Sequence, residues 1–395
     1  MKRIKEGVSM KLFKKIISLA CVAALCVMTF AACGSSADSG SSTASASKPA
    51  EAAATTETAA ASAATESTSA VAPATADGGL TPKVLGQDEI KIAYIPISTA
   101  GVTNKIVQLA FDDTIDAYAA TGTIKIDYFD PGYDAQTQIT MVNDAVNQKY
   151  DCIFLECADP VSLATPVAEA EAAGIPVVTL NLNAETPHTL HIRGVDYQAG
   201  WKACETLAND FGADSAKKVV IIDCPAPMAA TNLQSNGFLD YMEQNTNWEL
   251  LDQRNVDNFS QEGANTAMRD ILTKYDEIDI VFNMMDDLTT GTLQAIEASG
   301  RNDGSICVYG NMGNPSTFDV LTNGSGDLYG LNFCDYYTEY CIAMAYGLYY
   351  AMTGVCGGML GYTSTPEYAL SCWPVTPANA DLYKTLSRWD QALTH

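Results

Sequence analysis

The amino-acid sequence predicts an α/β protein with two doubly wound parallel-sheet lobes. From residue 89 onward, short apolar runs alternate with longer segments whose apolar residues recur at the spacing of a helix. This alternation favours parallel strands connected by helices that pack on both faces of a sheet. The series then repeats, and residues 88–395 provide enough chain for two such lobes.

The first series of elements begins with a buried strand at residues 91–97. A helix is expected at 103–121, where Ile106, Leu109, Ala110 and Ile115 recur at helical spacing. The glycine at 174 ends the last helix of the series. The other expected elements are strands at 124–129, 152–155 and 175–180 and helices at 136–148 and 161–173.

The second series has the same rhythm. Strands are expected at 219–222, 278–282 and 306–309, an extended run at 249–255, and helices at 231–244, 262–274 and 288–298. Ligands of open parallel sheets bind beyond the carboxyl ends of the strands. The expected site therefore lies in the loops that follow Ile97, Phe129, Leu155, Leu180, Ile222, Phe282 and Tyr309.

The N-terminus has the pattern of an export signal. Basic residues at 11, 14 and 15 precede an uncharged run at 16–30 and the small residues Ala31-Ala32 before Cys33. This run is shorter than the roughly 20 residues that a spanning helix needs. The segment resembles the lipobox of bacterial lipoproteins, although Phe30 stands where that family usually has Leu. The resemblance implies a signal peptide at 1–32, lipidation of Cys33, and an extracytoplasmic protein that is lipid-anchored to the bacterial cell membrane.

Composition changes again after the leader. Residues 34–87 are mainly Ala, Ser, Thr, Gly and Pro, and they carry too little apolar surface to offset the entropy of ordering. Residues 33–87 are therefore predicted to form a disordered tether. The chain has 47 acidic against 22 basic residues, so no nucleic-acid partner is expected.

The cysteines and histidines do not indicate a metal or a cofactor. No Cys-x-x-Cys pair occurs, and no nucleophile with an orienting base stands out, so neither a zinc ribbon nor an enzyme is expected. His188 and His191 are expected on an edge strand or loop. Cys356 and Cys372 flank a glycine-rich loop and are the best disulfide candidates. The cysteines expected to be buried apolar residues are 152, 157, 204, 224, 307, 334 and 341.

Seven phrases, in order, resemble type I periplasmic solute-binding proteins of ABC importers, the ribose- and galactose-binding kind. The resemblance covers residues 90–354. The phrases are Asp130-Pro-Gly-Tyr-Asp-Ala-Gln136, Lys149-Tyr-Asp-Cys-Ile-Phe-Leu155, Ala173-Gly-Ile-Pro-Val-Val178, Val195-Asp-Tyr-Gln-Ala-Gly200, Asn236-Gly-Phe238, Asp286-Asp-Leu-Thr-Thr-Gly291 and Val308-Tyr-Gly310.

The resemblance implies a three-crossing hinge between the lobes, with crossings near 194–196, 310–313 and 331–335. The N-terminal lobe would contain residues 88–194 plus about 313–332, and the C-terminal lobe 195–312 plus about 333–395. Such proteins are monomers whose lobes close over a ligand, and an ABC permease in the membrane recognises the closed form. DNA-binding repressors share the fold, but a lipobox stands here where they carry a helix-turn-helix.

The same resemblance implies a set of ligand-binding positions, most of which differ from the sugar-binding relatives. Asn181-Leu182 replace Asp-Arg, Gln234 replaces Arg, and Met285 replaces Asn. Asn311-Met312 replace an aromatic-Asp pair, Asn332 replaces Gln, and Phe259 retains the aromatic that packs on the sugar. The predicted ligand-binding residues are Asn181, Gln234, Phe259, Met285, Asn311, Met312 and Asn332.

These replacements remove most of the charged groups that clasp adjacent hydroxyls. We therefore expect a neutral, amide-lined and more apolar pocket that holds an uncharged small molecule, either a sugar or a sugar-like compound. A nucleoside or a small signal molecule is the alternative ligand class. A receptor of the same fold that signals to a membrane kinase is the alternative to a transport function.

Overall fold

The computed structural model describes residues 82–395 except 100–101, 119–122, 224–228, 257–258 and 325–326. The predicted signal peptide at 1–32, the predicted lipidation site Cys33, most of the predicted tether and Cys224 lie outside the described residues. Among the described helices, none combines the length and the apolar character needed to cross a membrane.

The first lobe is built on a six-stranded sheet with the order β11-β5-β4-β3-β1-β2. All of its strands pair in parallel, and β3 and β4 are buried throughout because helices cover both faces. Its strands are β1 (Ile90–Ile95), β2 (Ile124–Tyr128), β3 (Cys152–Leu155), β4 (Val177–Leu180), β5 (Leu190–Gly194) and β11 (Glu367–Leu370).

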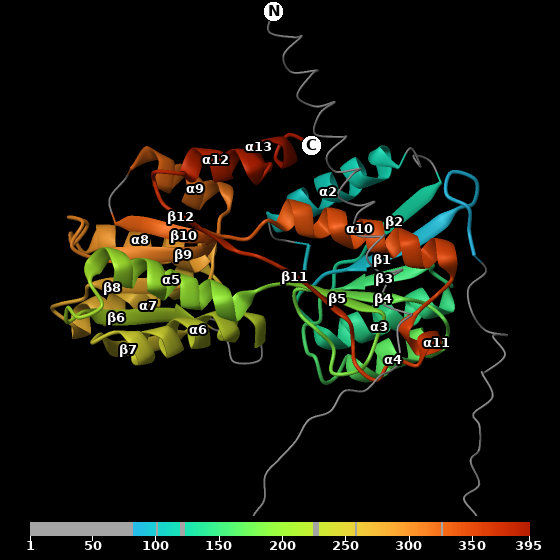
Figure 1. Ribbon diagram of the computed structural model, residues 1–395, viewed down its shortest axis with the longest axis horizontal. Coiled ribbons are helices and arrows are strands. Elements are labelled where there is room, and N and C mark those ends of the chain that lie inside the picture. Colours follow the sequence, from blue (N-terminus) through green and yellow to red (C-terminus); the bar gives the residue numbers. More distant parts are fainter. Residues whose placement is uncertain (1–81, 100–101, 119–122, 224–228, 257–258, 325–326) are drawn as a thin grey trace, which may run out of the picture. The chain divides into compact units, whose positions relative to one another are not determined.

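Helices cover the two faces of this first sheet in pairs. α2 (Thr103–Ala117) packs beside α10 (Tyr336–Thr353) on one face (Figure 1). α3 (Ala135–Asn147) and α4 (Ala164–Ala172) pack together on the other, next to the short α11 (Gly357–Leu360). The core between α3, α4 and the sheet is mainly aliphatic and includes Val142, Val167 and Ile153.

The second lobe repeats the design with the strand order β12-β10-β9-β8-β6-β7. Its strands pair in parallel except β12, which is antiparallel to β10. The strands are β6 (Lys218–Asp223), β7 (Glu249–Asn255), β8 (Ile280–Asn283), β9 (Cys307–Met312), β10 (Leu328–Phe333) and β12 (Trp373–Val375).

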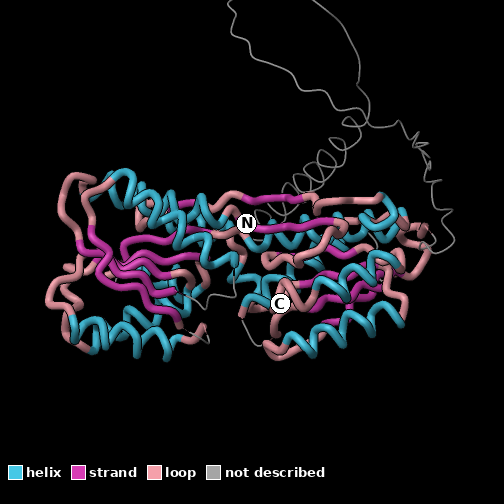
Figure 2. Tube along the Cα trace, turned by 90° about the horizontal axis from the view of Figure 1, so that it is seen from below, coloured by secondary structure: helices cyan, strands magenta, loops and turns pink. Residues whose placement is uncertain are grey.

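The helices of the second lobe are arranged in the same layered way (Figure 2). α5 packs against α6, whereas α7 packs against α8 and α9 packs against α8, β10 and α12. Their bounds are α5 (Asp196–Phe211), α6 (Ala229–Asn245), α7 (Gln261–Lys274), α8 (Asp286–Ala298), α9 (Pro315–Asn323) and α12 (Ala380–Leu386). The last helix, α13 (Trp389–Ala392), packs against α2 of the first lobe.

Two glycines allow α5 and α6 to pack closely. A Cβ added at Gly200 would lie 1.8 Å from the carbonyl oxygen of Gln234, and one at Gly237 would lie 2.0 Å from that of Tyr197. No larger residue fits at either position without moving a helix backbone. The close approach places Gln234 of α6 next to Asp196, the first residue of α5.

The chain crosses between the sheets after Gly194, after Phe333 and after Leu370. The predicted two-lobe α/β architecture is confirmed, and so are the crossings expected near 194–196 and 331–335. The crossing expected near 310–313 is wrong, and the crossing after Leu370 was not expected, so the assignment of residues to the lobes needs correction. Residues 313–332 belong to the second lobe, because β10 pairs with β9 and α9 packs on β10. The segment that returns to the first lobe is 336–370, and the 310–313 region only ends β9.

Three smaller expectations also need correction. The end of the predicted tether packs on the first lobe, where Lys83 N donates to the Met352 carbonyl (2.9 Å). His191 lies in β5, which pairs with β11 on one side and β4 on the other, so His191 is not on an edge strand. Cys356 and Cys372 are not paired, because Cys356 Sγ donates to the Glu171 carbonyl and Cys372 Sγ lies against Cys334 Sγ.

Candidate ligand-binding site

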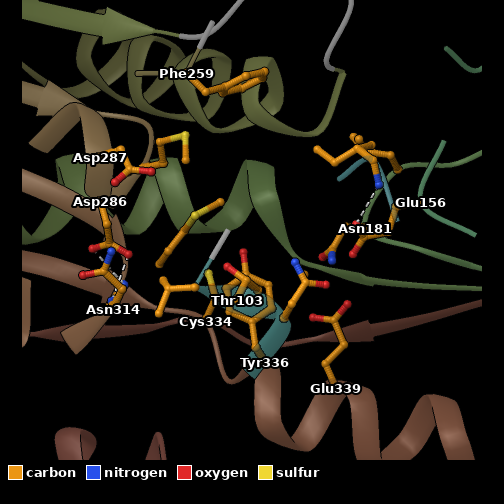
Figure 3. Close-up of a pocket in the computed structure, with 18 of the residues that line it drawn as sticks. Thr103, Glu156, Asn181, Phe259, Asp286, Asp287, Asn314, Cys334, Tyr336 and Glu339 are labelled. Atoms are coloured by element: carbon orange, nitrogen blue, oxygen red, sulfur yellow. Dashed lines mark hydrogen bonds between the residues drawn. The ribbon is translucent and has the colours of Figure 1, made fainter. Parts of the chain in front are cut away.

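A pocket of about 270 Å³ lies between the two lobes, at the carboxyl ends of their strands. Its volume is near the lower end of the roughly 300–1,000 Å³ that is typical of small-molecule sites. The loops after β1, β3 and β4 line it from the first lobe, and the loops after β8 and β9 line it from the second. The start of α10 and Trp389 complete the wall. Figure 3 shows side chains from these segments converging on one space.

The wall from the first lobe is built around Glu156, the residue that follows β3. Its carboxylate accepts hydrogen bonds from the Tyr340 hydroxyl and from Ile97 N (3.4 Å). Asn181, after β4, donates to the same Tyr340 hydroxyl from Nδ2 (3.3 Å). Burial raises the pKa of Glu156, although these hydrogen bonds oppose the shift. A carboxyl and an amide are thereby held side by side at the pocket.

In the second lobe, Asp286 begins α8 and holds the loop after β9. Its carboxylate accepts hydrogen bonds from Asn314 N (2.9 Å), Gly313 N (3.3 Å) and the Thr317 hydroxyl. Burial raises the pKa of Asp286 to about 7, even though these donors favour the charged form. The neighbouring Asp287 also lines the pocket (Figure 3).

The hinge contributes two further carboxyl groups. Asp196 accepts a hydrogen bond from Gln234 Nε2 (2.9 Å), and burial raises its pKa to about 6. Glu339 on α10 is buried, and its pKa is well above the usual range, first because of burial and then because of Glu156 and Asp196. Among the described residues, neither Glu339 Oε1 nor Gln234 Oε1 has a hydrogen-bond partner. Two buried side-chain oxygens are therefore available to hydrogen-bond a ligand.

Aromatic side chains form much of the remaining surface. Tyr94 and Tyr340 pack edge to face, with ring centroids 6.4 Å apart. The buried Trp389 donates from Nε1 to the Gly313 carbonyl (2.9 Å), which fixes its indole at the pocket. The other aromatic residues that line the pocket are Tyr133, Phe259 and Tyr336.

The backbone is left-handed at four of the lining residues that are not glycine. They are Tyr133 (φ 66°), Asn181 (φ 55°), Phe259 (φ 52°) and Met312 (φ 84°). Such conformations cost on the order of 1–3 kcal/mol each and concentrate at functional sites, where the surrounding structure holds them. The left-handed conformations of these four residues therefore cost free energy, which the packing around their loops must offset.

Five of the seven predicted ligand-binding residues line this pocket: Asn181, Gln234, Phe259, Met285 and Met312. The remaining two, Asn311 and Asn332, are buried behind its wall. Asn332 Nδ2 donates to Asn311 Oδ1 (2.9 Å) and to the Ala199 carbonyl (2.8 Å), while Asn311 Nδ2 donates to the Asn283 carbonyl (2.6 Å). These contacts tie β8, β9, β10 and α5 together, which is a supporting role.

The lining is richer in acidic groups than the sequence suggested. Five carboxyl groups line the pocket, and no Lys, Arg or His is present among the described lining residues. The expected amides are there, and burial raises the pKa of each of the five carboxyl groups, which favours their neutral form. Glu156 directly follows a predicted strand, so the rule about strand ends could have identified it. The residues missed by sequence reasoning are Glu156, Asp196, Asp286, Asp287 and Glu339.

The comparisons with known proteins identify relatives of a large part of the two-lobe region. A family model described as a periplasmic binding protein domain matches residues 92–349. The ribose import binding protein of Bacillus subtilis strain 168 is 27% identical over 201 residues, which cover 51% of this chain and 63% of that relative. The xylitol-binding protein of Mycolicibacterium smegmatis is 25% identical over 189 residues, which cover 47% and 53%. The matches thus span between half and two thirds of these relatives' length.

Solved structures share the fold over a longer region. An ABC transporter solute-binding protein from Bacillus halodurans with bound myo-inositol has 20% identity and a TM-score of 0.65, and the match covers 76% of this chain and 99% of that one. The myo-inositol binding protein of Caulobacter has 16% identity and a TM-score of 0.66, with 78% and 100% covered. These likenesses confirm the predicted two-lobe fold with its hinge.

Proposed function

This chain belongs to the family of periplasmic binding proteins, and we propose that it captures an uncharged sugar or sugar-like molecule between its lobes. The observation that carries the proposal is the composition of the pocket wall. Carboxyl, amide and aromatic groups surround the space, and no cationic side chain lies among the described lining residues. We propose a binding role without catalysis, which is the role of the family to which the chain belongs.

The chemistry of these groups suits hydroxylated, uncharged molecules. Hydroxyl groups donate hydrogen bonds to carboxylates and amide oxygens, and hydrogen bonds to charged acceptors are worth about 1.5–3 kcal/mol each. Aromatic faces such as Tyr94 and Phe259 can cover the apolar faces of a sugar ring. An anionic ligand would meet five acidic groups with no compensating cation among the described lining residues, which opposes its binding.

The names of the relatives point to the same ligand class. Curated relatives are named for the import or binding of ribose, xylitol, D-apiose and D-allose. The similar structures hold myo-inositol and D-allose. All of these molecules are small, uncharged and rich in hydroxyl groups, and the pocket is of a matching size.

The proposed partner is an ABC permease, reached by closure of the lobes on the ligand. Three chain crossings form a hinge of the kind that lets two lobes rotate about a cleft. We further propose that the protein acts as a monomer outside the cytoplasm, held at the membrane by a lipid on Cys33. A Cys33→Ala variant that stays in the membrane fraction of expressing cells would contradict the anchor.

A thermal-shift panel on the mature chain tests the ligand class. Neutral pentoses, hexoses, polyols and inositols are compared with glucuronate and ribose 5-phosphate at equal concentration. A neutral compound at about 100 times its Kd stabilises the folded state by about 2.7 kcal/mol, which appears as a higher Tm. Stabilisation by the anionic compounds alone would contradict the proposal, as would stabilisation by none of the panel.

A further inference from the structure

The sulfur atoms of Cys334 and Cys372 lie 3.3 Å apart at the hinge. Cys334 directly follows β10, and Cys372 directly precedes β12. These strands are antiparallel, with Phe333 opposite Trp373, so the two cysteines occupy the next facing position. Facing residues of an antiparallel pair have Cα atoms about 4.5–5.5 Å apart. A disulfide spans Cα separations of about 4.4–6.8 Å, so this position accommodates one.

All three crossings of the chain meet at this pair. Cys334 lies on the second crossing and Cys372 on the third. A Cβ added to Gly194, on the first crossing, would lie 3.7 Å from Cys372 Sγ. The first and third crossings are also joined by Val195 N, which donates to the Leu370 carbonyl (2.9 Å). The sulfurs therefore lie where the lobes turn relative to each other.

The other described cysteines lack this arrangement. Cys152, Cys157, Cys204, Cys307, Cys341 and Cys356 are buried within a lobe, whereas Cys334 and Cys372 are only half-buried. Partial exposure gives a small reagent access to the pair. Cys334 also lines the ligand pocket, so its oxidation changes a side chain of the pocket wall.

We propose that Cys334 and Cys372 form a reversible disulfide that couples the second and third crossings of the hinge. The oxidant is a low-molecular-weight disulfide. One cysteine thiolate attacks it, forms a mixed disulfide and releases one thiol. The second cysteine then attacks the mixed disulfide and releases the other thiol. The two cysteine protons end on the two released thiols, and the two electrons reduce the oxidant's S–S bond.

The consequence of oxidation is a stiffer hinge. Hinge residues absorb the φ and ψ changes of closure, and a bond between two crossings forces them to change together. The bond also closes a loop over residues 334–372, which holds α10 and β11 of the first lobe. Loop closure of this kind stabilises the folded state by restricting the unfolded chain.

Peptide mapping of the mature chain tests the bond without any need for ligand. The protein is incubated with oxidised glutathione, alkylated and digested without reduction, and mass spectrometry locates linked peptides. A Cys334–Cys372 peptide pair is expected as the main product, and reduction should remove it. Complete alkylation of both cysteines, or pairing of either one with another cysteine, would overturn the proposal.

Variants test the effect on the hinge. Oxidation should raise the Tm of the wild type by roughly 5 °C and slow amide exchange at residues 333–337 and 370–375. Cys372→Ser should abolish both effects, while the matched control Cys307→Ser, in β9, should keep them. Equal responses of the wild type and Cys372→Ser would refute the coupling. The outcome does not depend on whether the proposed sugar binds.

Discussion

The Tyr340 hydroxyl donates a hydrogen bond to the Glu156 carboxylate, joining two residues that are 184 positions apart in the chain. Glu156 directly follows β3, and Tyr340 lies in α10, the helix in which the chain returns to the first lobe after β10 of the second. The pocket wall is therefore complete only when the returning segment has docked. Ligand affinity should therefore depend on the position of α10, which follows the second crossing of the hinge, as well as on the loops at the strand ends.

Replacing Glu156 with Gln should weaken ligand binding. The change keeps the size of the side chain but removes the charged acceptor, which costs about 1.5–3 kcal/mol for one ligand hydroxyl, or roughly 10–150-fold in Kd. Isothermal titration with the stabilising neutral compound measures the effect. Glu169→Gln, on the exposed side of α4, is the matched control and should leave Kd unchanged. An unaltered Kd for Glu156→Gln would remove this residue from the site.

The protonation of Asp286 should make the stability of the folded protein depend on pH. Its pKa is raised to about 7 in the folded protein, so the folded state binds more protons than the unfolded state between about pH 4 and pH 7. Stability should therefore fall as pH rises through this window. Asp196, with a pKa raised to about 6, contributes in the same direction over the lower part of the window.

Urea unfolding from pH 4 to pH 8 measures this slope in the wild type and in Asp286→Asn. The variant should show a flatter profile, with a difference on the order of a few kcal/mol across the window. Asp276→Asn, at an exposed position, should reproduce the wild-type slope. A wild-type stability that rises steadily from pH 4 to pH 7, with Asp286→Asn unchanged, would contradict the assignment.

The pattern of apolar residues along the sequence predicted the strands that are buried along their whole length. β3 and β4 are short apolar runs that are buried at every residue, and both were expected at nearly their observed bounds. β5 was missed because its sequence, Leu-His-Ile-Arg-Gly, is not an apolar run. Its buried His191 has a hydrogen-bond partner, because Nδ1 lies 2.9 Å from Thr179 Oγ1, and such a partner cannot be read from the sequence.

The lobe assignment could not be predicted from local pattern. β10 and α10 are both strongly apolar, and nothing in either segment says which sheet it joins. The same limit explains the site. Five of the residues inferred from the family phrases reach the pocket, but Glu339 and Trp389 come from segments that dock by long-range packing. Asn332 was predicted as a ligand residue because it stands where the sugar-binding relatives have Gln, yet its side chain bonds to Asn311.

Gly200→Ala should destabilise the protein and weaken ligand binding together. The added Cβ would lie 1.8 Å from the Gln234 carbonyl oxygen, so α5 and α6 must separate. Overpacking of this kind costs about 1–3 kcal/mol, and the separation moves Gln234 away from Asp196. Urea unfolding and titration measure the two effects. Asn209→Ala, on the exposed side of α5, should change neither. A Gly200→Ala protein of wild-type stability would refute the close packing of these helices.

The C-terminal helix α13 should stabilise the junction between the lobes. Trp389 is buried in α13 and donates to the Gly313 carbonyl of the second lobe (2.9 Å). The adjacent Arg388 bonds to Asp113 of α2 in the first lobe (3.1 Å) and lies 4.5 Å from the centroid of the Tyr337 ring. The segment thus contacts both lobes beside the pocket.

Two substitutions separate the contributions of Trp389. Trp389→Phe loses the hydrogen bond and should cost about 1 kcal/mol, while Trp389→Ala also leaves a cavity and should cost about 3–5 kcal/mol. Both should weaken binding of the neutral ligand, because Trp389 lines the pocket. Trp373→Phe is the control, since that side chain is 48% exposed and should tolerate the change. Equal stability of Trp389→Ala and the wild type would show that the helix is not held at the lobe junction.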